Sequence, residues 1–73
     1  ALVQAQEAQR LYRSAAANLD LANATRLVAL ANAALSQDAC ALAAWREAGV
    51  LYSQIGVKEG ADECERRIRA LTP

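Results

Sequence analysis

Histidine, methionine and phenylalanine are absent from this chain of 73 residues, and proline occurs once. Without histidine, the chain lacks the usual general base and the commonest metal ligand. No apolar run approaches the ~18 residues that a membrane-spanning helix needs. The formal net charge is zero, whereas nucleic-acid-binding domains usually carry a basic excess. We therefore expect no metal, no cofactor, no membrane span and no nucleic-acid partner.

Cysteine is also scarce, with Cys40 and Cys64 as its two occurrences. If helices on either side of a turn near Gly56 run antiparallel, Cys64 faces Gly49 and Cys40 lies level with the end of the chain. Cys40 and Cys64 would therefore lie ~13 Å apart along the helix axes, well beyond the Cα separation of a disulfide. We expect two small buried thiols and no disulfide.

Apolar residues make up 55% of the chain, with alanine dominant and only three glycines. This composition is typical of one small all-α domain. The spacing of apolar residues predicts four helices. They cover about 2–17, 21–35, 39–55 and 58–71. Asn18 and Asp20 mark the break between the first two helices. Asp38, or alternatively Ser36, is expected to cap the start of the third helix, and Gly56 is expected to end that helix.

Each predicted helix has one apolar face. In the second helix the face comprises Leu21, Ala24, Leu27, Val28, Ala31 and Leu35. In the third helix it comprises Leu42, Trp45, Ala48, Gly49, Tyr52 and Ile55. In the fourth helix it comprises Ala61, Cys64, Ile68 and Leu71. The acidic residues Asp62, Glu63 and Glu65 lie four positions before arginines, which is typical of a solvated helix face rather than a catalytic group.

The second half of the chain carries a recognisable spacing. Trp45, Gly49 and Tyr52 are followed by Gly56, by Ala61 and by a final proline, Pro73. This order resembles the tetratricopeptide repeat, a helical hairpin of ~34 residues. Ala48 stands where that family has leucine, and Glu65 where it has an aromatic residue. In the first half the match is degenerate: Tyr12 corresponds, but it lies 40 residues before Tyr52 instead of ~34.

The resemblance implies two antiparallel helical hairpins, 2–35 and 38–71, in a single domain, as a fragment of a right-handed α-solenoid. In that family the first helix of each hairpin lines a groove that binds a peptide or helix. The corresponding partner-binding residues here are Gln6, Arg10, Arg13, Arg46, Val50, Ser53 and Gln54. Arginines around one groove favour an acidic segment or a C-terminal carboxylate as partner.

The sequence therefore predicts a non-catalytic protein-interaction module, as a unit of a longer repeat array. One alternative is a structural subunit whose apolar helix faces form homo-oligomers. Another is a small adaptor that resembles secretion chaperones and assists assembly. We expect no enzymatic activity, because Cys64 lies on an apolar face without a neighbouring base. With no signal peptide visible, a cytoplasmic location is expected.

Overall fold

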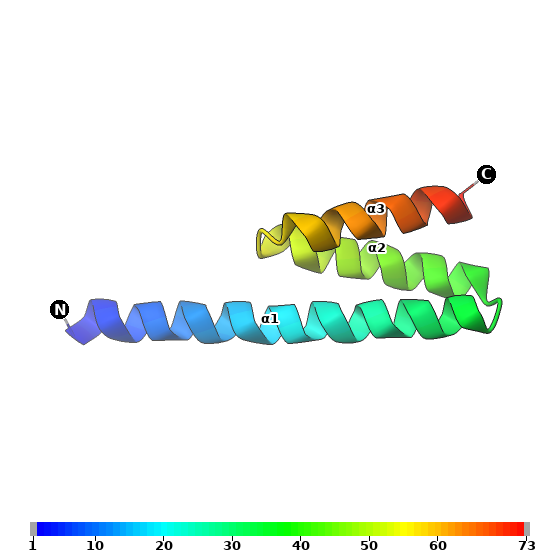
Figure 1. The fold of residues 1–73 in the computed structure, drawn as a ribbon. Helices are drawn as coiled ribbons and strands as arrows, with labels where there is room; N and C mark the ends of the chain where they lie inside the picture. The colour runs from blue at the N-terminus through cyan, green and yellow to red at the C-terminus, as the bar shows by residue number, and fades with distance from the viewer. Residues whose placement is uncertain (1, 73) are drawn as a thin grey trace.

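The computed structural model describes the backbone of residues 2–72 and the side chains of residues 14 and 16–72. Over this range the fold is all-α, as predicted, and contains no strand. Its three helices are α1 (Leu2–Ala34), α2 (Asp38–Gln54) and α3 (Lys58–Leu71). They lie antiparallel to their neighbours in the chain and form an elongated molecule of 53 × 18 × 14 Å (Figure 1).

The prediction of four helices in two hairpins is wrong, because α1 runs without interruption through the expected break at Asn18–Asp20. Asn and Asp are good capping residues, but inside a helix each costs only about 0.5–0.7 kcal/mol relative to alanine. Neither glycine nor proline lies near that point, and alanines precede and follow it. The first hairpin, and with it the two-hairpin solenoid, therefore does not form.

Both turns that do form place one residue in the left-handed region. At the end of α1 this residue is Ser36 (φ 58°), and at the end of α2 it is Gly56 (φ 74°). In each turn the next amide donates to a carbonyl five residues back, at 2.9 Å from Gln37 to Asn32 and 2.9 Å from Val57 to Tyr52. This is the Schellman arrangement that closes a helix and satisfies its last carbonyls.

The start of α2 is less tightly capped than expected. Asp38, predicted as the cap of its helix, is instead the first helical residue, and Gln37 precedes it without a side-chain cap hydrogen bond. Ser36, the alternative cap, ends the preceding helix. The carboxylate of Asp38 still lies in the first turn, where the helix dipole favours negative charge.

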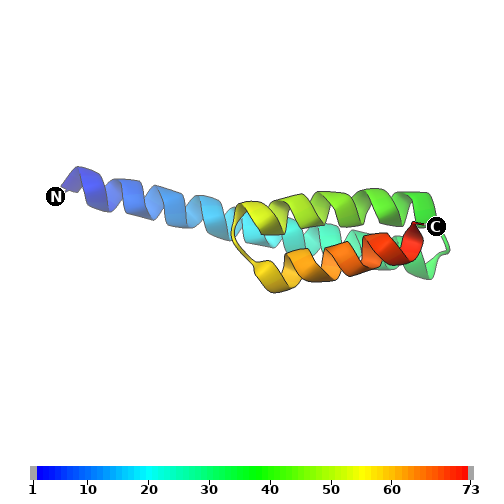
Figure 2. The same cartoon turned by 90° about the horizontal axis from the view of Figure 1, so that it is seen from above.

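Helix α2 lies between the other two. It packs along both α1 and α3, and seen from above α2 and α3 lie side by side over α1 (Figures 1 and 2). Among the described residues, the Arg26–Glu63 ion pair also joins α1 to α3. At ~1.5 Å per residue, the 33 residues of α1 span ~50 Å and the 17 residues of α2 span ~25 Å. The N-terminal half of α1 therefore extends past the hairpin of α2 and α3 (Figure 2).

The core is small and built around two aromatic side chains. Trp45 and Tyr52, both buried, belong to one cluster with Cys64 and five alanines. The alanines are Ala22, Ala29, Ala41, Ala44 and Ala48. Small residues on α1 leave room for the large rings of α2, so the two helices interdigitate.

The predicted apolar face of residues 21–35 is not the face that α2 covers. Ala22, Thr25 and Ala29 are buried, whereas Leu27 is 62% exposed and Leu35 is 68% exposed. The hydroxyl of Thr25 donates to the carbonyl of Leu21 at 2.8 Å, so burying it leaves no polar group without a partner. Leu21, Leu27, Val28 and Leu35 consequently face solvent, whereas Leu30 is partly buried against the core.

Candidate binding groove between α2 and α3

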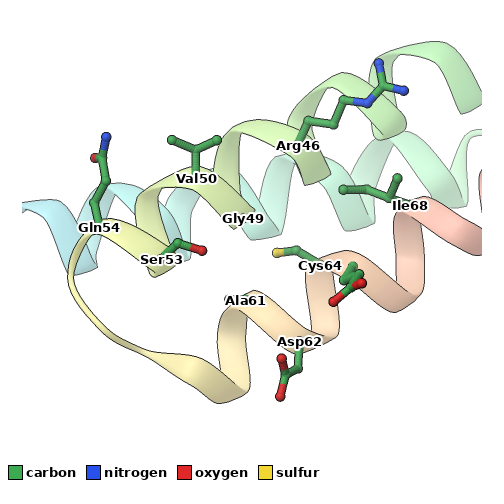
Figure 3. A pocket seen from close by; sticks show the side chains of 10 residues that line it. Arg46, Gly49, Val50, Ser53, Gln54, Ala61, Asp62, Cys64 and Ile68 are labelled. Atoms are coloured by element: carbon green, nitrogen blue, oxygen red, sulfur yellow. The ribbon is translucent and has the colours of Figure 1, made fainter.

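An open groove of about 780 Å³ runs between α2 and α3 (Figure 3). Helix α2 lines it with Arg46, Gly49, Val50, Ser53 and Gln54, and α3 lines it with Ala61, Asp62, Cys64, Glu65 and Ile68. On α2 the lining positions fall at offsets of 0, 3, 4, 7 and 8, and on α3 Ala61, Cys64, Glu65 and Ile68 fall at 0, 3, 4 and 7, so each set forms one face of its helix. No described residue of α1 lines this groove.

The floor of the groove is formed where Gly49 of α2 meets Cys64 of α3. A Cβ atom added to Gly49 would lie 3.3 Å from the Cβ of Cys64, so glycine permits this approach. Cys64 is fully buried, and this burial raises the pKa of its thiol. The thiol therefore stays protonated at neutral pH and contributes apolar surface rather than a nucleophile.

The two rims of the groove differ in charge. Arg46 on α2 is exposed and makes no ion pair within the described residues, and Gln54 lies two turns further along the same rim. On α3, Asp62 is half-buried, and Glu65 accepts a hydrogen bond from Arg69 at 2.5 Å. One rim is thus basic and amide-bearing, and the other is acidic.

The side of the hairpin away from the groove is tied to α1 by an ion pair. The Arg26 guanidinium donates through Nε and Nη2 to the two carboxylate oxygens of Glu63, at 2.6 and 3.1 Å. This fork-to-fork geometry is the strongest form of a charged hydrogen bond. It holds the pKa of the Glu63 carboxyl below its usual value and raises the pKa of Arg26.

A second polar link lies beside this ion pair. The phenol of Tyr52 donates to the amide oxygen of Asn23 at 2.5 Å, although its ring is buried. Burial also raises the pKa of this phenol.

Arg67 lies over the ring of Trp45, 5.5 Å from its centroid, at cation–π distance. These contacts fix α3 and α2 against α1 and so set the shape of the groove.

The sequence did not predict these links from α1 to α2 and α3. Neither Asn23 nor Arg26 belongs to the apolar face predicted for residues 21–35, and Glu63 was expected to pair within its own helix. Nη2 of Arg67 does lie 3.9 Å from a carboxylate oxygen of Glu63, but Nε of Arg26 lies closer, at 2.6 Å. A pair 37 positions apart leaves no local spacing signal, because only the packing of three helices brings it together.

The predicted partner-binding residues divide into two groups. Arg46, Val50, Ser53 and Gln54 lie side by side along the groove, as Figure 3 shows. Gln6, Arg10 and Arg13 belong to α1, but their side chains lie outside the described residues. Because the first hairpin does not form, the expected groove between two hairpins is absent from the described fold.

The described residues show few other features of a chemical site. No cluster of three metal-ligating side chains occurs among them, and no described helix is long and apolar enough to span a membrane. Cys40 and Cys64 are both free thiols, as predicted. Cys40 is exposed, however, and not buried, because it faces away from the core that its neighbour Ala41 enters.

Over the described residues the fold is all-α, a helical hairpin supported along one side by a longer helix. Comparison with family models, with curated proteins and with solved structures finds no match to this chain. The resemblance of residues 45–73 to a tetratricopeptide repeat therefore remains a prediction from the sequence.

Proposed function

We propose that this chain is a non-catalytic protein-interaction module and that the groove between α2 and α3 binds a helix of a partner protein. The groove itself is the observation that carries this proposal. Its volume, about 780 Å³, lies in the range of ligand sites, and its floor is apolar. Val50, which lines the α2 side, is 58% exposed, so a partner could bury it.

The chemistry of the rims describes the partner. An amphipathic helix binds such a groove through apolar residues at i, i+3, i+4 and i+7. Arg46 favours an acidic residue along one edge of that helix, and Asp62 favours a basic residue along the other. An entirely acidic segment is disfavoured, because Asp62 and Glu65 line the opposite rim. The proposed partner therefore carries both charges, which refines the expectation of an acidic peptide.

A designed peptide tests this proposal directly. The probe is a helix with one apolar stripe, glutamates along one edge and lysines along the other, titrated into ¹⁵N-labelled protein. We expect amide shifts confined to the lining of the groove. Arg46→Glu should weaken binding, because it places a carboxylate against the acidic edge of the peptide.

Glu47→Lys provides the matched control. Glu47 is exposed on α2, next to Arg46 in sequence, but it does not line the groove. This charge reversal should leave the affinity unchanged. Shifts spread over α1, or equal affinities for Arg46→Glu and the natural protein, would show that the groove is not the binding site.

A further inference from the structure

One face of α1 presents a regular apolar stripe to solvent. Its members are Leu21, Ala24, Val28, Ala31 and Leu35, the last directly after the helix. All five side chains are exposed: Leu21 is 50% exposed, Val28 54% and Leu35 68%. The spacing of three, four, three and four is that of a helix seam that packs on another helix. The stripe is separate from the groove, which no described side chain of α1 lines.

The stripe is symmetric about its centre. Read from either end it runs Leu, Ala, Val, Ala, Leu, with Val28 in the middle. An antiparallel copy therefore places Leu21 against Leu35, Ala24 close to Ala31, and Val28 against its own equivalent. The alanines let the helix axes approach closely, and the larger side chains pack at the ends and the centre.

Charge does not oppose this pairing. No stripe residue is charged, and the flanking Asn32 directs its amide to the carbonyl of Val28 at 3.0 Å. Asp20, next to one end, would meet Ser36 of the second copy rather than another carboxylate. Arg26 is engaged by Glu63 and does not point across the stripe. A two-fold contact needs a surface that matches itself, and this one does.

We infer that the stripe of α1 is an interface between two copies of this chain, packed antiparallel with the two-fold axis at Val28. The stripe is ~21 Å long at ~1.5 Å per residue, which is short for a stable dimer. The dimer is therefore reversible, and it dissociates on dilution. In this arrangement the two grooves lie on separate hairpins and remain open.

Cysteine cross-linking tests both the interface and its register. With Cys40→Ser as background, Val28→Cys brings two thiols together on the axis and should give a disulfide-linked dimer within minutes of mild oxidation. Ala24→Cys is the control, because its two copies are offset by ~12 Å along the axis and cannot form a disulfide. A parallel dimer would link both variants equally, and a random encounter would link both slowly; either result overturns the inference.

Mass by light scattering tests the same interface without a covalent bond. Between about 10 µM and about 1 mM the mass should rise from 7.8 kDa toward twice that value. Val28→Arg should remain monomeric at every concentration, with unchanged helicity because Val28 is exposed. Val50→Arg, an equally exposed valine on α2, should dimerise like the natural chain. A natural chain that stays monomeric, or a dimer that survives Val28→Arg, would disprove the interface.

Discussion

At the scale of single residues, the polar link between α1 and α3 is the most specific contact in the molecule. Arg26 and Glu63 form two parallel hydrogen bonds, and Glu63 is the less exposed of the two side chains. Arg26 retains 36% of its exposure, so water screens part of this attraction. The pair therefore determines how α3 packs against α1 more than it adds to the total free energy of unfolding.

The pH dependence of stability should report this pair. The pKa of Glu63 is lower in the folded chain than in the unfolded one, chiefly because of the hydrogen bond from Arg26. Its stabilisation is thus present above the unfolded pKa and is lost as the pH falls through the folded pKa. In urea unfolding, Glu63→Gln should be less stable than the natural chain near neutral pH, and the difference should disappear in acid.

Glu65→Gln is the control for this measurement. Glu65 pairs with Arg69 one turn away, but both side chains are mostly exposed, at 59% and 76%. Such surface pairs contribute at most a few tenths of a kcal/mol. If Glu65→Gln and Glu63→Gln shifted the unfolding midpoint equally at every pH, the link between α1 and α3 would have no special role.

At the scale of elements, the hairpin of α2 and α3 was predicted well. Its helices were expected over 39–55 and 58–71 and lie at Asp38–Gln54 and Lys58–Leu71. Local signals sufficed here, because Gly56 must close α2 and the rings of Trp45 and Tyr52 must be buried. The close packing of two helices then brings Arg46, Val50 and Gln54 onto one groove.

Helix α1 was predicted poorly for a physical reason. Its break was placed at Asn18–Asp20 because both residues cap helices, yet the actual turn uses Ser36, an uncommon residue in the left-handed region. Its predicted apolar face included the large side chains Leu21, Leu27, Val28 and Leu35, which are exposed. Packing against Trp45 and Tyr52 instead requires small residues such as Ala22 and Ala29. The sequence pattern of α1 alone does not indicate this requirement, because it depends on the side chains of α2.

The approach of α3 to α2 gives a prediction at this scale. A Cβ atom on Gly60 would lie 2.6 Å from two carbons of the Tyr52 ring, which is a clash. Gly60→Ala should gain about 1 kcal/mol in helix propensity but lose about 1–3 kcal/mol from overpacking. We expect net destabilisation in urea unfolding, together with strain on the hydrogen bond from Tyr52 to Asn23.

Gly49→Ala is the natural comparison, because its added Cβ would lie 3.3 Å from the Cβ of Cys64. A shift of a few tenths of an ångström relieves that contact, so this variant should be clearly more stable than Gly60→Ala. Should Gly60→Ala prove more stable than the natural chain, the packing of α3 on Tyr52 described above would be incorrect.

At the scale of the whole molecule, the central claim is that a single hairpin rests on one long helix. This arrangement provides the groove between α2 and α3 and leaves the stripe of α1 uncovered. A chain of two hairpins would instead fold residues 2–35 back on themselves and would present a different pair of surfaces. Both the proposed helix-binding groove and the proposed dimer depend on which of these arrangements is correct.

The most direct test is a distance between two spin labels on α1, placed at Gln6→Cys and Ala33→Cys with Cys40→Ser as background. The remaining Cys64 is buried and has a raised thiol pKa, so it should not be labelled; a chain without the two introduced cysteines checks this. Measured on dilute protein, one continuous helix predicts a separation of ~40 Å between the labelled backbone positions. A hairpin that turns at Asn18–Asp20 would bring them within ~10 Å, and that result would contradict the account.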